Sequence, residues 1–302
     1  MKPNKTEYDP KLNSYEVVIA GGAMIGTAIA WFLISNRDFN GKILVVEKDP
    51  TLEFSSTSRT NNSIRQQFSN RLNIEISKFS SNYILNFKSY MENDERIPEI
   101  VFNKIGYLYL ADDKKKFKLL KKNQKLQNSL NIPTKIYDQN SLLEKFPYLN
   151  VKNLIGGSYN NYNEGYFDSN TIFSWWKKKA AEKGVEFIKN EVTEIALGSK
   201  KINAITLKDG SKLKIGSFVN ATGTKASTFD KTHFLRIPVE PRKRYTFIFK
   251  SEAKINNSLP LIIDPTGIHF RSDGNYFLCG CAPEFDDTVA YDDFTIDYEL
   301  WE

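Results

Sequence analysis

Residues 15–26 read YEVVIAGGAMIG, and this stretch decides the fold of the chain. A short β-branched run ends in a glycine-rich turn, and residues 27–34 continue as an apolar helix pattern. Residues 43–46 form a second apolar strand, which Glu47 closes about 20 residues beyond the turn. The order of strand, glycine turn, helix, strand and acid is the outline of a dinucleotide-binding βαβ unit.

Each part of this pattern has a physical role in holding a nucleotide. Gly21, Gly22 and Gly26 let the backbone approach a pyrophosphate, and the N-terminus of the helix offers free N–H groups and a positive dipole end. Ala23 stands where the motif has its second glycine, and its methyl group narrows the approach to the phosphates without blocking it. Glu47 can accept hydrogen bonds from a ribose diol.

A membrane anchor is the competing interpretation of the same region. Residues 17–34 are uncharged throughout and match the length of the shortest membrane-spanning helices. However, the glycines divide the stretch into a strand and a helix, Glu16 lies directly before it, and no basic cluster flanks it. We therefore predict no transmembrane segment.

Length and composition are those of an ordinary globular protein. A chain of 302 residues can bury a large core and is expected to hold two domains. The net charge of +6 is spread along the chain, and its densest cluster, residues 114–125, alternates lysines with leucines as a surface helix does. We expect no nucleic-acid partner, because basic charge is not gathered on a patch with interleaved aromatic residues.

Cysteine and histidine are too few and too badly spaced for a disulfide framework or a zinc site. Cys279 and Cys281 lie two apart in an apolar strand and face the same side, so they cannot easily bridge each other. The only histidines are His233 and His269. We therefore expect no metal site, and a location in the reducing cytoplasm.

The order of elements predicts an α/β fold of two domains, with a β-rich domain inserted into a Rossmann-type cofactor-binding domain. The predicted bounds are residues 14–95 and 166–235 for the cofactor domain, and residues 96–165 and 236–302 for the inserted domain. Within the second cofactor segment, Asp209-Gly210 indicates a hairpin turn. Residues 212–215 are expected to form one strand, and residues 218–223 a further strand that runs into a small-residue turn.

The chain resembles a known family. The glycine turn, Glu47, the polar loop at residues 55–63 and the VNATG stretch at residues 219–223 are together similar to the FAD-dependent oxidoreductases of the D-amino-acid oxidase (DAO) superfamily. SIRQQFS at residues 63–69, GYFD at residues 165–168 and VEPRKR at residues 239–244 resemble a narrower branch. That branch holds bacterial proteins similar to the mitochondrial FAD-dependent oxidoreductase domain-containing protein.

This resemblance implies a set of FAD-binding residues. They are Gly21, Gly22, Ala23, Gly26, Glu47, Lys48, Ser58, Arg59, Asn61, Val192, Ala221, Thr222 and Gly223. Attachment is expected to be non-covalent, because the polar loop holds no histidine or cysteine. Ser58 and Asn61 could instead make only turn hydrogen bonds, and Val192 could be an ordinary strand core residue.

The resemblance also implies an enzyme, an FAD-dependent oxidoreductase that oxidises a small amine or amino acid by hydride transfer to flavin N5, as sarcosine and glycine oxidases do. Arg65 is the first candidate to bind a substrate carboxylate and Arg271 the second, because the guanidinium fork matches two carboxylate oxygens. His269 is equally a proton-transfer group or a structural histidine. A 2-hydroxy-acid dehydrogenase and a flavin-binding assembly factor without turnover remain open.

Members of the superfamily continue with a further helix, a strand and a glycine-rich turn that contacts the flavin. No such segment follows residue 284 here, and residues 298–302 read as the inside of a helix. The resemblance therefore implies a chain truncated at its C-terminus, in which the last FAD-binding segment is absent.

Overall fold

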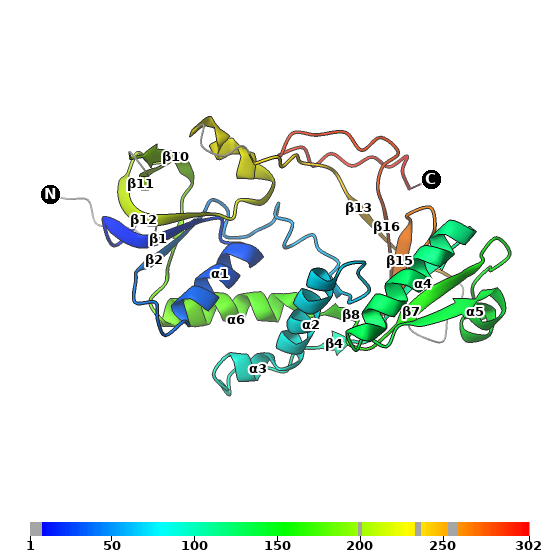
Figure 1. Cartoon of the computed structure of the whole chain (residues 1–302). Coiled ribbons are helices and arrows are strands. Elements are labelled where there is room, and N and C mark those ends of the chain that lie inside the picture. The colour runs from blue at the N-terminus through cyan, green and yellow to red at the C-terminus, as the bar shows by residue number, and fades with distance from the viewer. Residues whose placement is uncertain (1–7, 199–200, 233–236, 253–258, 302) are drawn as a thin grey trace. The chain divides into compact units, whose positions relative to one another are not determined.

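The computed structural model describes residues 8–198, 201–232, 237–252 and 259–301, which form two compact units (Figure 1). Unit 1 comprises residues 1–60, 169–241 and 288–293. Unit 2 comprises residues 61–168, 242–287 and 294–302. His233 and the predicted domain boundary after residue 235 lie outside the described residues.

Unit 1 is built on a six-stranded sheet with the order β10-β11-β12-β1-β2-β9. Its elements are β1 (Ser14–Ala20), α1 (Met24–Ile34), β2 (Ile43–Glu47), α6 (Ser169–Glu182), β9 (Glu186–Lys189), β10 (Val192–Leu197), β11 (Ile202–Leu207), β12 (Lys212–Asn220) and the 3₁₀ helix η1 (Gly223–Thr232). Strands β12, β1, β2 and β9 run parallel, whereas β10 and β11 pair antiparallel. The predicted strand–helix–strand unit is confirmed as β1, α1 and β2.

Both faces of β1 and β2 are buried, which explains why their sequences are apolar without alternation. Val17 and Ile19 face a core that includes Ala30 of α1 and Ala180 of α6. The residues between them, such as Val18, face a second core formed with β10, β11 and β12. The β1–α1 turn is therefore held on a rigid scaffold.

Two details of this sheet test the sequence predictions. Gly210 has φ +87° between β11 and β12, which confirms the predicted hairpin turn. The expected pair of strands at residues 212–215 and 218–223 is wrong, because β12 is one continuous strand. Its first residues, Lys212 to Lys214, pair with β11 on one side, and the segment from Lys214 to Asn220 pairs with β1 on the other.

Unit 2 contains a seven-stranded sheet with the order β13-β16-β15-β14-β5-β7-β6 and a three-stranded sheet with the order β3-β8-β4. Its helices are α2 (Arg71–Leu85), α3 (Phe87–Tyr90), α4 (Lys114–Ser129) and α5 (Gln139–Lys145). Its strands are β3 (Ser63–Ile64), β4 (Phe102–Asn103), β5 (Tyr107–Ala111), β6 (Lys135–Asp138), β7 (Gly156–Asn160), β8 (Gly165–Phe167), β13 (Tyr245–Phe249), β14 (Leu261–Ile263), β15 (His269–Asp273) and β16 (Tyr276–Cys281). The predicted α/β fold class is confirmed.

The strand register separates the two faces of the seven-stranded sheet. One face carries Leu108 and Leu110 of β5 into an apolar core with Leu142 and Phe146. Tyr107 and Tyr109 alternate with these leucines and therefore lie on the opposite face. The pairing continues this opposite face through Ile263 to His269 and Arg271 on β15, and to Ser158 and Asn160 on β7. We call it the tyrosine face.

The predicted domain bounds differ from those of the compact units. Residues 61–95 were expected with the cofactor domain, but they belong to unit 2. Ser63 and Ile64 pair with β8, and Gln127 of α4 donates to the carbonyl of Phe68 at 3.1 Å. These long-range contacts cannot be read from the local pattern of this segment.

The expected helix over residues 298–302 is also wrong. The described residues 298–301 form a turn, in which the Trp301 N–H donates to the carbonyl of Tyr298 at 3.0 Å. The Trp301 ring lies against Phe247 and Phe249 of β13, with ring centroids 5.1 and 5.3 Å apart. Trp301 thus packs on the sheet instead of continuing the expected helix.

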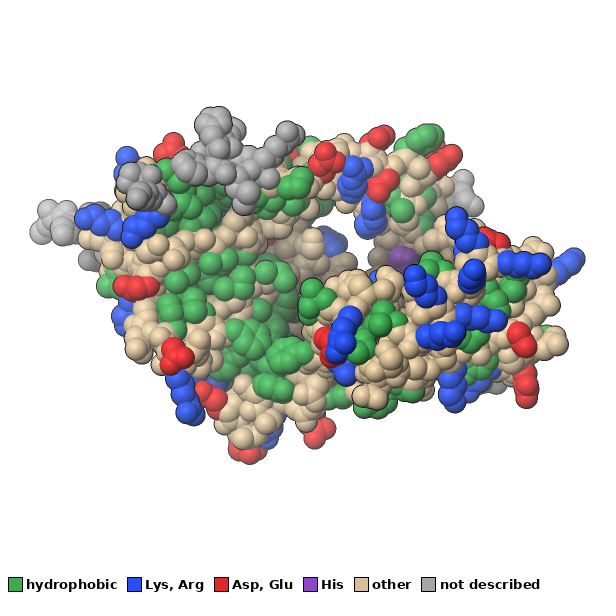
Figure 2. Space-filling model, in the orientation of Figure 1, with side chains coloured by type: hydrophobic (Ala, Val, Ile, Leu, Met, Phe, Trp, Pro, Cys, Tyr) green, Lys and Arg blue, Asp and Glu red, His purple; other side chains and the backbone are tan. Residues whose placement is uncertain are grey.

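Other predictions concern the surface and the cysteines. Figure 2 shows lysine side chains gathered over α4, where every lysine is exposed, as a solvated helix face requires.

Within the described part of the chain, no helix is both long and apolar enough to span a bilayer. Cys279 and Cys281 are both free thiols. The described residues contain no group of three or more potential metal ligands.

Candidate functional site

The glycine turn of unit 1 lies where the ends of three parallel strands meet. Gly21 has φ +99°, and a Cβ placed on it would lie 2.3 Å from the carbonyl oxygen of Ala221, just beyond β12. A Cβ on Gly22 would lie 2.9 Å from the Cβ of Glu47, at the end of β2. The structure therefore brings together predicted residues that are 200 positions apart in the sequence.

Gly26 has a different role in the same turn. A Cβ on Gly26 would lie 1.8 Å from the carbonyl oxygen of Gly21, so only glycine lets α1 approach β1 this closely. The hydroxyl of Thr27 donates to the carbonyl of Gly22 at 2.8 Å and fastens the first turn of the helix. Gly26 thus sets the packing of the helix on the strand.

The Glu47 carboxylate is oriented by two backbone N–H groups. Gly22 donates to Oε2 at 2.7 Å and Asp49 donates to Oε1 at 2.8 Å. Each oxygen keeps acceptor capacity for a further donor. Glu47 is half-buried, so its free acceptor sites can reach a bound diol.

We predict that Glu47→Gln weakens FAD binding by roughly 10- to 100-fold, the loss typical of a charged hydrogen bond. The amide keeps the shape of the side chain and one acceptor oxygen, so circular dichroism should change little. Glu194→Gln, at an exposed position of β10 in the same unit, is the matched control. FAD affinity equal to that of the wild type in Glu47→Gln would rule out the ribose assignment.

The polar loop before residue 60 is held mainly by its own hydrogen bonds. The Ser58 hydroxyl donates to the carbonyl of Leu52 at 2.6 Å, and Arg59 Nε donates to the carbonyl of Glu53 at 3.1 Å. These are the turn contacts that the sequence left open as an alternative to cofactor binding. Thr57, which the sequence analysis did not select, accepts the Met24 N–H at 3.2 Å and joins the loop to the start of α1.

The remaining cofactor candidates of unit 1 surround the same strand ends. The Thr222 hydroxyl donates to Asn220 Oδ1 at 2.7 Å, which shapes the turn that leads to Gly223. Val192 is buried in the apolar core that β10 shares with β12, as the strand-core alternative requires. Lys48 lies at the surface, where partial loss of solvent and the neighbouring Lys225 ammonium lower the pKa of its side chain.

These features fit the adenosine diphosphate half of FAD. Ala23, the N-cap residue of α1, makes no side-chain cap hydrogen bond, and the first turn of the helix holds no acid. An anion can therefore bind at the positive end of the helix. The glycine turn leaves backbone rather than side chains at that end. Glu47 adds an oriented acceptor for the ribose.

Arg65, in unit 2, carries a guanidinium that is held by rings and not by acids. Its centre lies 4.7 Å from the ring centroid of Phe68 and 5.9 Å from that of Tyr109. Its Nε is buried and has no hydrogen-bond partner, and its side chain forms no ion pair with any residue in the described ranges. The half-buried fork is therefore available to a carboxylate ligand.

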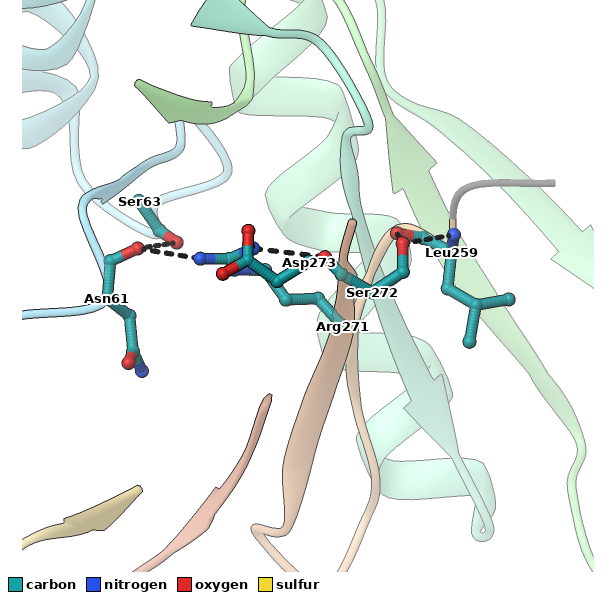
Figure 3. Close-up of polar contacts among 6 residues, drawn as sticks. All are labelled: Asn61, Ser63, Leu259, Arg271, Ser272 and Asp273. Atoms are coloured by element: carbon teal, nitrogen blue, oxygen red, sulfur yellow. Dashed lines mark hydrogen bonds and ion pairs between the residues drawn. The ribbon is translucent and has the colours of Figure 1, made fainter. Parts of the chain in front are cut away.

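Arg271 is committed to the fold to a greater degree. Figure 3 shows it extending from β15 to the carbonyl oxygen of Asn61, to which Nη2 donates at 3.2 Å. Nη1 donates to the carbonyl of Ser272 and to Asp273 Oδ1, and the guanidinium covers the Tyr166 ring at 3.9 Å. Arg271 is 4% exposed. Like Arg65, Arg271 has a buried Nε without a hydrogen-bond partner, but both of its Nη atoms already donate to the fold.

Asn61, predicted to line the cofactor, lies in unit 2 and joins two strands. Its carbonyl accepts from Ser63 at 3.1 Å and from Arg271, and its Oδ1 accepts from Thr246 of β13 at 3.3 Å. These bonds match the local role that the sequence left open for Asn61.

His269 lies on the tyrosine face, two residues before Arg271. A Cβ on Gly280 would lie 2.7 Å from its Nε2, so the imidazole rests directly on the backbone of β16. Burial lowers the pKa of His269, which is half-buried. The ring is therefore neutral at pH 7 and able to accept a proton.

Glu164 is the residue of unit 2 that sequence reasoning missed. It is fully buried, and its Oε1 accepts the N–H groups of Gln66 and Gln67 at 2.6 and 3.0 Å. Its Oε2 accepts from Gln67 Nε2 at 3.0 Å. The only available signal was its place between Asn163 and Gly165, which is typical of a turn and does not indicate burial.

Burial raises the pKa of Glu164 to about 7, above its ordinary value of 4.5. The folded chain holds this proton more tightly than the unfolded chain. The contribution of Glu164 to the free energy of unfolding is therefore greatest below the unfolded pKa and is lost as the pH rises through the folded one. We predict that Glu164→Gln, which cannot ionise, gains up to about 3 kcal/mol relative to the wild type between about pH 5 and pH 8. Urea titrations of both proteins at both pH values measure this gain. If the free energy of unfolding of Glu164→Gln relative to the wild type is the same at both pH values, the prediction is wrong.

The family model described as "FAD dependent oxidoreductase" (DAO) matches residues 16–302. This match confirms FAD as the cofactor that the sequence predicted. The chain is 28% identical to the FAD-dependent oxidoreductase domain-containing protein 1 of Xenopus laevis over 95% of its own length and 64% of that protein. It spans less than two thirds of the length of the curated relatives that it matches.

Solved structures confirm the predicted Rossmann-type FAD-binding fold. L-proline dehydrogenase from P. horikoshii superposes with a TM-score of 0.80 at 24% identity and covers 96% of this chain and 74% of that one. Glycine oxidase from Bacillus cereus superposes with a TM-score of 0.67 at 18% identity, over 92% of this chain and 74% of that one. Such low identities establish the fold alone.

Proposed function

Because the chain belongs to the family of FAD-dependent oxidoreductases, we propose that it oxidises a small amine or amino acid that carries a carboxylate. Bound FAD supplies the hydride acceptor, N5 of the flavin ring. The observation that supports this substrate class is the Arg65 guanidinium, whose buried Nε has no partner and which no acid neutralises among the described residues.

The chain's own residues take three roles in this proposal. Arg65 binds the carboxylate through its fork, and the rings of Phe68 and Tyr109 hold the fork in place. His269, neutral and half-buried on the tyrosine face, accepts the proton that a substrate ammonium must lose before its C–H bond is oxidised. The glycine turn and Glu47 hold the adenosine diphosphate half of FAD.

We prefer an amine to a 2-hydroxy acid as the substrate because of the structurally similar proteins. The two solved proteins reported above are named for proline and glycine, which are both amino acids. A carboxylate clamp alone would serve a 2-hydroxy acid equally well. The proposal therefore needs a test that separates the two.

Anaerobic bleaching of the FAD-loaded protein provides this test. We expect proline, sarcosine or glycine to reduce the flavin, and pyrrolidine, which lacks the carboxylate of proline, to fail. Reduction by lactate in place of the amines would assign a 2-hydroxy-acid dehydrogenase. If no member of either class bleaches the flavin, the substrate class is wrong and a binding role without turnover takes precedence.

The mode of FAD attachment is tested on the same preparation. The polar loop at residues 55–63 holds no histidine or cysteine to link the flavin ring, so attachment is expected to be non-covalent. Acid precipitation should release yellow FAD into the supernatant. Colour that remains in the protein pellet would contradict this expectation.

A further inference from the structure

The backbone on either side of Arg65 is fixed by buried side chains. Its own carbonyl accepts a hydrogen bond from the hydroxyl of Ser77 on α2. The next two peptide N–H groups, those of Gln66 and Gln67, both donate to Glu164 Oε1. The arginine is therefore presented from a backbone held at three consecutive residues, whereas its guanidinium makes no hydrogen bond to the residues that the structure describes.

Glu164 is itself held by a network that reaches the strands of the sheet. The Gln67 amide donates to Glu164 Oε2 at 3.0 Å and to the carbonyl of Tyr107 on β5 at 2.9 Å. The hydroxyl of Ser158 on β7 donates to Gln67 Oε1 at 3.0 Å. Every one of these hydrogen bonds to the Glu164 carboxyl group is donated to it. Such a setting suits the carboxylate, because an added proton would displace one donor.

We propose that Glu164 is a positioning residue for carboxylate recognition: by accepting the two N–H groups that follow Arg65, it sets the place of the guanidinium fork. This inference rests on the proposed function of Arg65. A guanidinium meets both oxygens of a carboxylate only within a small range of positions. The backbone that holds Arg65 therefore affects the affinity for a carboxylate ligand. Glu164 acts through the backbone and does not touch the ligand.

The proposal has a pH dependence of defined sign. Glu164 titrates near neutrality because burial raises its pKa to about 7. A neutral carboxyl group accepts the Gln66 and Gln67 N–H groups more weakly than a carboxylate does, so the affinity for a carboxylate ligand should fall as the pH drops. Glu164→Gln should behave at all pH values as the protonated wild type does.

Other titratable groups near Glu164 do not produce the same profile. They are Arg65, Tyr107 and Tyr109 on the tyrosine face, Tyr159 on the far side of β7, and Arg271 near Tyr107. Burial raises the pKa of all three tyrosines, so none of the three loses its proton near pH 7. His269 titrates below its ordinary range, and its contribution would persist in Glu164→Gln.

The experiment measures the affinity of the FAD-loaded protein for acetate by calorimetry, between about pH 6 and pH 8.5. We expect the wild type to lose roughly 5- to 10-fold in affinity towards the lower pH. Glu164→Gln should show the weaker affinity throughout, with a flat profile. Glu164→Asp, which keeps the charge on a shorter arm, gives a second variant. Glu144→Gln, exposed on α5, is the matched control and should follow the wild type.

The outcomes separate this inference from the proposed function. If Glu164→Gln and Glu164→Asp bind acetate as the wild type does while Arg65→Lys binds it weakly, the positioning role is overturned and the clamp stands. If Arg65→Lys also binds as the wild type does, the proposed function fails and the positioning role fails with it. If neither Glu164 variant folds, the wild-type profile decides, and affinity independent of pH overturns the inference.

Discussion

Arg65→Lys is expected to bind carboxylate substrates roughly 10- to 100-fold more weakly than the wild type while FAD stays bound. Lysine keeps the positive charge but loses the planar fork that accepts both carboxylate oxygens. It also loses the stacking on Phe68, which lies 4.7 Å from the arginine centre. The loss should appear in KM and in the affinity for acetate, because the interaction is with the ground state as well as the transition state.

Arg71→Lys is the matched control for this experiment. Arg71 is exposed at the start of α2 in the same unit, so the same substitution there should leave KM unchanged. Kinetics of Arg65→Lys that equal those of the wild type would remove Arg65 from the site. Arg271→Lys would then be tested next, although the contacts of Arg271 with Asn61 and Asp273 predict a loss of stability in that variant.

Gly26→Ala is expected to destabilise unit 1 by roughly 3 kcal/mol and to abolish FAD binding. The added methyl would lie 1.8 Å from the carbonyl oxygen of Gly21 and 3.2 Å from Ile19 Cγ2. The Gly21 carbonyl cannot easily yield, because Gly21 directly follows β1, which is paired on both sides and buried on both faces. The helix would have to move away from the turn, which removes its N-terminus from the place where a pyrophosphate binds.

Ala28→Gly in the same helix is the control, since it removes a methyl group instead of adding one. It should cost only about 1 kcal/mol of helix propensity and retain FAD. Denaturant unfolding and the flavin content of the purified protein measure both variants. A yellow Gly26→Ala protein with wild-type stability would show that the close approach of α1 to β1 is not required.

The local pattern of residues 15–47 was sufficient to predict the cofactor turn. Glycines, a helix and a terminal acid follow one another at short range, so their spacing alone places Gly21, Gly26 and Glu47 at one end of a sheet. The structure then added contacts that no local pattern holds. Ala221 reaches Gly21 only because β12 pairs with β1 across 200 residues of sequence.

The division of the chain into compact units depends on contacts that a local pattern does not contain. Residues 61–95 follow the polar loop directly, and nothing in their composition separates them from it. Their strand β3 pairs with β8, and the carbonyl of Phe68 accepts from Gln127 of α4, so both partners lie far along the chain. Sequence resemblance identified Arg65 within this stretch but did not show which backbone holds it.

The sequence by itself determined the βαβ unit, because its glycines, helix and terminal acid lie at short spacing. The resemblance to the family then indicated FAD as the cofactor, which the family match confirms, and an arginine as the candidate to bind a carboxylate. Only the tertiary structure decided that Arg271 is bound to the fold whereas Arg65 is not, and that Glu164 is a buried acid behind Arg65. The physical reason is that burial and hydrogen-bond partnership arise from long-range strand register. From the sequence, a carboxyl group beside a turn glycine is expected to be exposed. In the structure, β5, β7 and the Gln66–Gln67 backbone enclose the Glu164 carboxyl group.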